Sequence, residues 1–210
     1  MAAPESKNIH NLNGKWQMNK TLSDSFEPVL SLQGVGFFIR KGINAATMTL
    51  HIAQSTGAPS EPAQDPVDAS ETVEHINIDQ VITGGIKGTT EKRCVDNRRR
   101  EHTDWLFGHV SGRTLFYKSA AEVSKDFTDE FLIKGFGDQE VLVSHVVNLD
   151  SGKGWVATQV WGFQTVKDGS RRYVRHVVVT SGEGSKQQRV AVELVYDFVG
   201  EREEETDLAY

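Results

Sequence analysis

The sequence predicts an all-β fold: an up-and-down barrel of about ten antiparallel strands with a helix–turn–helix lid. Three observations lead to this prediction. From residue 47 onward, apolar and polar residues alternate with the period of strands that bury one face. Short glycine-containing turn signals separate the alternating segments. Only GVGFFIRKGINAA (34–46) carries a long apolar stripe at helical spacing instead.

The N-terminal elements follow from local signals. Residues 1–13 show no periodic pattern and are expected to form a flexible arm, and GKWQMN (14–19) is expected to be the first strand. Two short amphipathic helices are predicted at 23–46, where Ser23 or Asp24 is suited to cap the first helix. The second helix has one apolar stripe, made of Val35, Phe38, Ile39, Gly42, Ile43 and Ala46.

Nine further strands are expected after the lid, joined mostly by short hairpins. Because about ten meandering strands leave two exposed edges unless the sheet closes, we expect a closed barrel with a cavity. The helix pair would then cover one mouth of that barrel. The predicted strands are TMTLHIAQ, TVEHINIDQVIT, KGTTEKRCVD, HTDWLFGHV, RTLFYKS, VLVSHVVNL, GWVATQVWGFQTV, RRYVRHVVVT and QRVAVELVYDFV.

Three segments lie outside this alternation. Residues 56–71 hold three prolines and few apolar residues, which predicts a mobile loop. Residues 119–138 are expected to form either one helical turn or a long loop. The acidic residues 201–210 are expected to be a frayed tail. The remaining range, 14–200, is interpreted as a single barrel domain.

Composition narrows the functional classes. The 210 residues are 38% hydrophobic and 25% charged, as in a globular protein, and the net charge of −6 argues against a nucleic-acid partner. The basic run at 98–100 is an exception to this charge and is more readily interpreted as a solvated hairpin tip. The seven histidines show no metal-ligand spacing, so neither a metal nor another cofactor is expected.

The compartment is predicted from what the sequence contains. Cys94 is the single cysteine, so no disulfide can form within the chain. The N-terminal residues do not resemble a signal peptide, and no stretch approaches the roughly 20 apolar residues of a membrane helix. We therefore expect a cytoplasmic protein without stable membrane insertion.

Residues 11–47 resemble the start of the intracellular fatty-acid-binding proteins, a lipocalin-like (calycin) β-barrel family. The resemblance implies a ten-stranded barrel with two capping helices, in which Trp16 plugs the closed end. The whole chain also resembles fungal proteins of this barrel type. The matching residues are Gly14, Trp16, Asn19, Phe26, Gly34-Val35-Gly36-Phe37 and Arg40-Lys41.

The family's last strand often carries Arg-x-Tyr to hold a ligand carboxylate. Here Tyr196 is kept, but Leu194 stands where the arginine would be. If Tyr196 faces the lumen, strand parity also places Leu194 inside. On the preceding strand, the family's turn position would put Tyr173 and Arg175 inside, so that Arg175 supplies the missing cation. The alternative is that Arg175 lies on the outer wall and pairs with an acid across strands, because one bulge reverses the parity.

Two aromatic positions complete the candidate ligand-binding set. Phe38 is expected to lie over the barrel mouth as part of the lid. Trp161, on one face of GWVATQVWGF with Trp155 and Phe163, either lines the cavity or packs the core. The ligand-binding candidates are therefore Phe38, Trp161, Tyr173, Arg175, Leu194 and Tyr196, whereas no catalytic residue is assigned.

Two active functions and one passive function fit this architecture. The first is intracellular binding of a hydrophobic small molecule, such as a fatty acid, polyketide or terpenoid, in the barrel cavity. The alternative is a cofactor-independent cyclase or isomerase, for example a pericyclase of secondary metabolism, with donors from Arg175, Tyr173, Tyr196 and His75. In the passive alternative, side chains fill the barrel and the protein serves as an interaction module.

Overall fold

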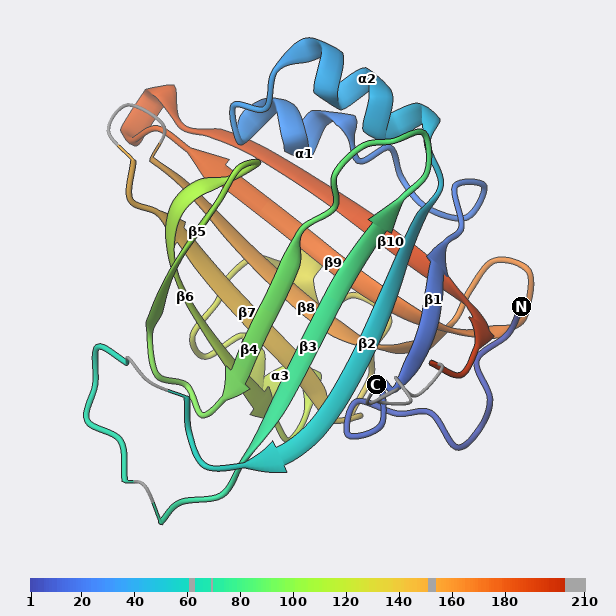
Figure 1. The fold of residues 1–210 in the computed structure, drawn as a ribbon, viewed down its shortest axis with the longest axis vertical. Coiled ribbons are helices and arrows are strands. Elements are labelled where there is room, and N and C mark those ends of the chain that lie inside the picture. The colour runs from blue at the N-terminus through green and yellow to red at the C-terminus, as the bar shows by residue number, and fades with distance from the viewer. Residues whose placement is uncertain (61–62, 69, 151–153, 203–210) are drawn as a thin grey trace, which may run out of the picture.

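The computed structural model describes residues 1–60, 63–68, 70–150 and 154–202. They form one sheet of ten strands that curls into a barrel, with helices across one end (Figure 1). The all-β prediction and the strand number are therefore confirmed. In chain order the elements are β1 (Gly14–Met18), α1 (Glu27–Leu32), α2 (Phe37–Ala45), β2 (Met48–Gly57), β3 (Val73–Ile82), β4 (Thr90–Val95), β5 (Arg100–Asp104), β6 (Gly108–Tyr117), α3 (Ala120–Val123), the 3-10 helix η1 (Glu130–Ile133), β7 (Val141–Asn148), β8 (Trp155–Thr165), β9 (Arg171–Ser181), the 3-10 helix η2 (Gly184–Lys186) and β10 (Gln188–Gly200).

The barrel closes differently from the expected antiparallel meander. Sheet neighbours run in the order β4-β3-β2-β1-β10-β9-β8-β7-β6-β5, and these pairs are antiparallel. A parallel pairing of Val95 with Thr114 then joins β4 to β6. Nine strands thus form a closed barrel, and β5 is an extra strand on β6. The parallel closure follows from chain direction, because β5 runs between β4 and β6 in sequence.

The boundary between β5 and β6 was predicted wrongly. HTDWLFGHV (102–110) was expected to be one strand, but a turn divides it. The carboxylate oxygen Oδ1 of Asp104 accepts hydrogen bonds from the backbone nitrogens of Leu106 (2.8 Å) and Phe107 (2.7 Å), and Gly108 then adopts a φ of 75°. An aspartate at this position stabilises a turn more strongly than alternation stabilises a strand.

The two-helix lid is confirmed, but the predicted N-cap is wrong. Helix α1 begins at Glu27, and no side chain caps it. Ser23 and Asp24 instead bind β10. The hydroxyl of Ser23 accepts from the backbone nitrogen of Val195 (2.8 Å), and the backbone nitrogen of Asp24 donates to the oxygen of Glu193 (2.9 Å). Serine and aspartate side chains satisfy a strand edge as readily as a helix start.

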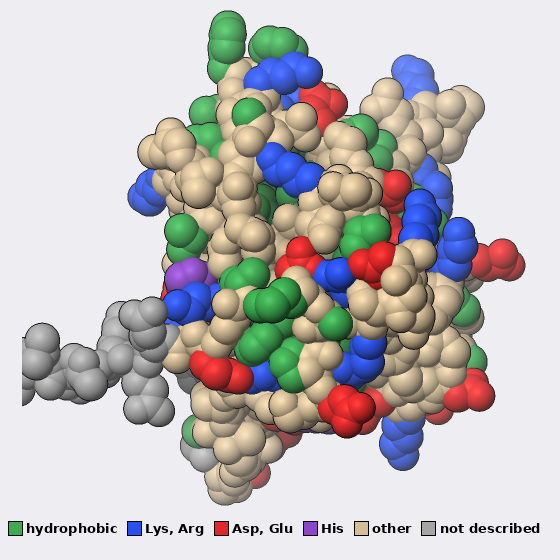
Figure 2. Space-filling model, turned by 90° about the vertical axis from the view of Figure 1, so that its right-hand side faces the viewer, with side chains coloured by type: hydrophobic (Ala, Val, Ile, Leu, Met, Phe, Trp, Pro, Cys, Tyr) green, Lys and Arg blue, Asp and Glu red, His purple; other side chains and the backbone are tan. Residues whose placement is uncertain are grey.

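The orientation of Phe38 was also predicted wrongly. Its side chain is 86% exposed, and that of Phe37 is 55% exposed, so neither packs into the barrel mouth. Helix α2 buries Ile43 instead, in the turn near its C-terminal end. Hydrophobic side chains stand beside Lys and Arg side chains at the top of the molecule, over the lid (Figure 2).

The closed end of the barrel contains the N-terminal residues. The range 1–13 was expected to be a flexible arm, but Ile9 and Leu12 are buried in the main core. The oxygen of Leu12 accepts a hydrogen bond of 2.7 Å from the indole nitrogen of Trp16. Trp16 is fully buried and packs edge-on against Phe163 and Phe198. It plugs this end, as the family resemblance implied.

Residues 119–138 cover part of the outer wall. They form α3 and η1 and build a second apolar cluster outside the barrel, against β6 to β10. His176 of β9 faces outward but is buried under this segment. One ring nitrogen lies 3.2 Å from the oxygen of Leu132, and the other lies 3.0 Å from Glu193. Strand alternation gives the face of His176 but not that another segment covers it.

The predicted loop 56–71 overlaps the end of β2, which runs to Gly57. Its backbone is linked to the β4–β5 connection, since the nitrogen of Gln64 donates to the oxygen of Arg99 at 2.9 Å. Residues 61–62 and 69 of this loop, and 203–210 of the predicted tail, lie outside the described residues. Within the described ranges, no helix is long and apolar enough to cross a membrane.

Candidate functional site

A cavity of about 350 Å³ lies inside the barrel under α1. Apolar side chains form most of its upper part, with Val29 and Leu30 contributed by the lid and Ile82, Ala157 and Val177 by the strands. The lid, β3, β8 and β9 therefore enclose a largely apolar space that suits a small hydrophobic molecule. The filled barrel that the passive alternative assumed is therefore wrong, whereas its interaction role is untested.

Arg175 lies on the inner wall at the floor of this cavity. It lines the cavity and stacks on Trp161 and Tyr196 of the main core, which excludes the outer-wall alternative. Alternation along β9 sets this orientation, and the β9–β10 register pairs Arg175 with Leu194 and Tyr173 with Tyr196. All four residues therefore face the lumen, as strand parity predicted.

Aromatic rings hold the guanidinium group in place. Nε of Arg175 donates to the hydroxyl of Tyr173 at 2.9 Å, and the guanidinium carbon lies 3.8 Å from the ring centroid of Trp161. The ring of Tyr196 is 5.5 Å away. Stacking of this kind stabilises a cation without consuming its hydrogen-bond donors. The Nη2 group of Arg175 is buried and has no hydrogen-bond partner among the described residues.

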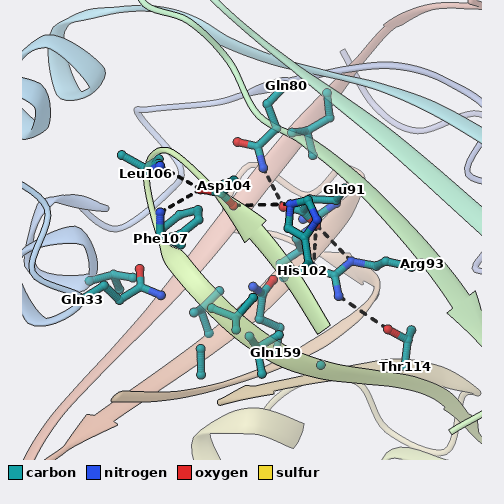
Figure 3. Close-up of a pocket in the computed structure, with 18 of the residues that line it drawn as sticks. Gln33, Gln80, Glu91, Arg93, His102, Asp104, Leu106, Phe107, Thr114 and Gln159 are labelled. Carbon is teal, nitrogen blue, oxygen red and sulfur yellow. Dashed lines mark hydrogen bonds and ion pairs between the residues drawn. The ribbon is translucent and has the colours of Figure 1, made fainter. Parts of the chain in front are cut away.

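A second polar group lies on β4, where sequence analysis assigned no site. Glu91 and Arg93 face inward because they pair with the inward residues Ile78 and Ile76 of β3. Nη2 of Arg93 lies 2.6 Å from Oε2 of Glu91, and Gln80 donates to the other oxygen of Glu91 at 2.6 Å (Figure 3). The alternation of Glu91, Arg93 and Val95 was the available signal, but it is indistinguishable from a solvated strand face.

The charges of this cavity do not cancel. Burial would raise the pKa of Glu91, but Arg93 and Arg175 lower it, so that the carboxylate is charged. Burial raises the pKa values of Tyr173 and Tyr196, so that both phenols are neutral at pH 7. Two cations, the buried Arg175 and the partly buried Arg93, thus face the partly buried Glu91 at the cavity floor. The uncompensated charge and the free Nη2 of Arg175 suit a carbonyl, enolate or carboxylate oxygen.

The remaining predicted site residues divide into three groups. Leu194, Tyr196 and Arg175 line the cavity. Trp161 and Tyr173 instead contact the guanidinium group of Arg175. Phe38 points away from the barrel, so its predicted place over the mouth is wrong. The participation of these residues in ligand binding stays a prediction.

His75 was considered as a donor into the cavity and does not face it. Its Nε2 lies 2.9 Å from the oxygen of Ala58 on the outer side of the barrel. Alternation explains this orientation, since the neighbouring Ile76 is buried in the main core. In the part of the chain that the structure describes, no group of three or more His, Cys, Asp or Glu side chains could hold a metal ion.

The cavity extends sideways to the surface near β5, where the rim is polar. His102 and Asp104 of β5 lie at this rim (Figure 3). Arg98 and Arg100 of the basic run are also at the rim, and both are paired with acids. Arg100 binds Asp96 at 2.7 Å and Arg98 binds Glu71 at 2.8 Å. The predicted hairpin tip is thus an ion-pair cluster between β4 and β5.

Comparison with known proteins gives two curated relatives that match nearly the whole chain. A probable pericyclase, scpY, of Mollisia scopiformis is 30% identical over 201 residues, which cover 95% of each chain. The pericyclase pydY of an Acremonium species is 28% identical over 202 residues, which cover 96% of this chain and 99% of the relative. No protein-family model matches the chain.

Among solved structures, similar folds include two fatty-acid-handling proteins. The REP1-NXSQ fatty acid transporter matches with a TM-score of 0.48 and 18% identity, over 90% of this chain and 96% of that chain. Fatty-acid-binding protein 1 of Echinococcus granulosus matches with a TM-score of 0.48 and 13% identity, over 90% and 97% of the two chains.

Proposed function

The chain belongs to the family that includes the pericyclases scpY and pydY, and from this premise we propose that it catalyses a pericyclic rearrangement of an unsaturated substrate. The reaction converts π bonds of the substrate into new σ bonds through a cyclic transition state. The product is an isomer, so the reaction gains or loses no atom or electron pair. The chain's own contribution is therefore to bind, orient and polarise.

The observation that carries this proposal is the free Nη2 of Arg175 at the floor of an apolar cavity. A carbonyl conjugated with a reacting double bond can accept a hydrogen bond from it. That bond withdraws electron density from the alkene, which lowers the barrier for addition of an electron-rich diene. The guanidinium is fixed by Tyr173 and Trp161, so little reorganisation is needed when charge grows on the oxygen.

The apolar upper part of the cavity supplies the second contribution. A flexible polyene that reacts with itself must fold so that its two reacting segments lie within contact distance. Walls built from Val29, Leu30, Ala157 and Val177 bound a space of about 350 Å³, which favours folded over extended conformations of the substrate. Restricting the substrate to one fold accelerates the reaction and selects one stereoisomer.

Carriage of a hydrophobic acid is the second candidate function. The uncompensated cation at the cavity floor would bind a carboxylate as well as it binds a carbonyl. Cys94 is buried and forms no disulfide, which supports a reducing location such as the cytoplasm for either function. Carrier and enzyme differ in one measurable property, namely whether the bound molecule leaves changed.

The test uses the purified protein and the substrates of the Acremonium pericyclase and of the probable Mollisia pericyclase. We expect products of unchanged mass, with one stereoisomer enriched over the uncatalysed mixture. Arg175→Met should lower the rate roughly 10²–10³-fold, the usual cost of losing one oxyanion donor. Arg189→Met is the matched control, because Arg189 pairs with Asp129 on the outside of the barrel.

Two results would contradict the proposed enzymatic function. One is recovery of unchanged substrate from a stable complex with the wild-type protein, which would favour the carrier. The other is an Arg175→Met variant as active as Arg189→Met, which would remove Arg175 from the reaction.

A further inference from the structure

At the lid end of the cavity, two lining side chains each carry a buried polar atom with no hydrogen-bond partner among the described residues. These atoms are Oε1 of Gln33 and Nε1 of Trp155, in side chains that are 6% and 2% exposed. Both residues line the same cavity as Arg175. Buried polar side-chain atoms are usually paired, because leaving one unpaired is unfavourable. Two such atoms at one end of a cavity therefore require an explanation.

Gln33 is held in place by the end of helix α1. Its backbone nitrogen donates to the oxygen of Val29 at 3.0 Å, and Gly34 follows with a φ of 79°. The chain thus turns directly after Gln33, which leaves its side chain beneath the lid. Figure 3 shows the carboxamide reaching from the α1 side into the cavity, on the opposite side from Glu91 and Arg93.

Trp155 begins β8 at the same end of the barrel. It pairs with Ser181, the last residue of β9, and α1 packs against β9 and β10. Its indole ring lies edge-on to Phe107, with the ring centroids 6.2 Å apart. The indole nitrogens of the other tryptophans have acceptors: Leu12 for Trp16, Gln159 for Trp161 and Gly88 for Trp105.

The two free atoms have complementary chemistry. The indole N–H of Trp155 can only donate, whereas Oε1 of Gln33 accepts. A hydroxyl group satisfies both, because its oxygen accepts one hydrogen bond and its proton forms another. A methyl group at this position would satisfy neither.

We propose that Gln33 and Trp155 form a second polar anchor for a hydroxyl group at the end of the substrate remote from Arg175. This inference rests on the proposed function and specifies its substrate class: an unsaturated chain with an acceptor oxygen at one end and a hydroxyl at the other. Binding at both ends would fix how the intervening chain folds. Gln33 and Trp155 are thus specificity-determining residues that select the stereoisomer, while Arg175 polarises the reacting carbonyl.

The test measures binding, so it does not depend on identifying the substrate. Medium-chain fatty acids displace cis-parinaric acid, a fluorescent conjugated tetraene acid, from the intact protein. Each acid is compared with its ω-hydroxy and ω-methoxy derivatives. In the wild-type protein we expect the ω-hydroxy acid to bind roughly three- to tenfold more tightly than the unsubstituted acid, as for one or two net hydrogen bonds. The ω-methoxy acid cannot donate and should lose this advantage.

The variants assign the preference to its residues. Gln33→Leu and Trp155→Phe should each abolish the hydroxyl preference, because each leaves one hydrogen-bonding capacity of the buried hydroxyl unpaired. Ser31→Ala, an exposed neighbour on α1, is the matched control and should keep it. Arg175→Met should weaken all three acids and leave the hydroxyl preference intact.

The outcomes separate this inference from its premise. Equal affinity of the ω-hydroxy and unsubstituted acids in the wild-type protein would overturn the second anchor while leaving the Arg175 site standing. A hydroxyl preference that survives both lid-end variants would overturn the assignment to Gln33 and Trp155. In a third outcome, the acids bind no better than their methyl esters in both the wild-type protein and Arg175→Met. That result would overturn the anion-binding role of Arg175 and this inference with it.

Discussion

Trp16 and Trp155 lie at opposite ends of one barrel, and both are buried. At the closed end, the indole nitrogen of Trp16 donates to Leu12 at 2.7 Å, and aromatic rings surround it. At the lid end, Trp155 lines a cavity, and its buried indole nitrogen has no partner in the described structure. The indole N–H of Trp16 thus has its acceptor within the core, whereas the indole N–H of Trp155 still lacks one.

The polar groups around each tryptophan repeat this difference. At the closed end, Gln54 accepts from Leu12 and donates to Ile9 and Glu74, and Lys7 binds Glu201. At the lid end and floor, Gln33 and Arg175 each keep a buried atom unpaired. A folded chain tolerates such atoms where a ligand pairs with them. The comparison teaches that the satisfaction of hydrogen bonds, more than burial, separates a structural end from a binding end.

The largest expected effect compares the two tryptophans directly. Trp16→Phe should destabilise the protein by about 3 kcal/mol, because it leaves a void in the core and an unpaired oxygen on Leu12. Trp155→Phe should cost about 1 kcal/mol or less, since its indole nitrogen has no partner to lose. Urea unfolding of both variants measures the difference. Equal losses would show that Trp155 is as structural as Trp16.

The next effect concerns Arg175 and separates stability from binding. Arg175→Met should leave the free energy of unfolding unchanged or raise it, since a buried cation in excess of its counterions is removed. The affinity for an acidic ligand should fall roughly ten- to a hundredfold, and that for its methyl ester much less. Isothermal titration with the acid and the ester measures this. A destabilised variant with unchanged affinity would assign Arg175 to the core.

Tyr196→Phe extends the same measurement across the cavity floor. We expect it to weaken the acidic ligand as well, and the double variant with Arg175→Met to lose less than the sum of the two. The two groups would share one ligand oxygen, so their contributions are not additive. Additive losses would indicate that Tyr196 and Arg175 bind different parts of the ligand.

A smaller, pH-dependent effect is expected at the closed end. The ring nitrogens of His10 lie 2.6 Å from Glu74 and 3.0 Å from Glu140. Burial alone would lower the pKa of His10, but its hydrogen bonds to these two carboxylates raise it. A raised folded-state pKa stabilises the protein fully below the unfolded value of about 6.5, and this contribution is lost as pH rises through the folded-state pKa.

His10→Gln tests this sign. The stability difference between the wild-type protein and the variant should be largest near pH 5.5 and shrink by about pH 8.5, as measured by urea unfolding at each pH. Because the His10 ring is partly exposed, solvent screens its ion pairs. We therefore expect a smaller loss of stability than for Trp16→Phe. A stability difference that grows with pH would contradict a stabilising role for protonated His10 between Glu74 and Glu140.

The smallest effect is expected on the outer face of the lid. Phe38→Ala should change the free energy of unfolding by less than about 0.5 kcal/mol, because the side chain is largely exposed. It should also leave the release rate of cis-parinaric acid unchanged in stopped-flow measurements. Ile43→Ala, the buried position of the same helix, should speed release. A faster release from Phe38→Ala would restore the lid function first predicted for it.

Strand and helix periodicity in the sequence determined the architecture and the direction of most side chains. Alternation in RRYVRHVVVT predicted that Tyr173 and Arg175 share a face, and the register with β10 confirms it. The Gly-x-Trp strand and the GVGF segment indicated the barrel family and the two-helix lid. These predictions succeed because backbone geometry imposes a period of two on strands and 3.6 on helices, whatever the rest of the chain does.

Only the tertiary structure decided which of those faces are covered, and by what. The N-terminal residues around Leu12 fill the closed end, and residues 119–138 bury His176 on the outer wall. Glu91 and Arg93 form a luminal ion pair because the register with β3 turns both inward and the closure of β4 onto β6 makes that face the inside of a barrel. A side chain's periodicity gives its direction, but its burial, charge state and free hydrogen-bonding atoms depend on segments that meet it only in the folded chain.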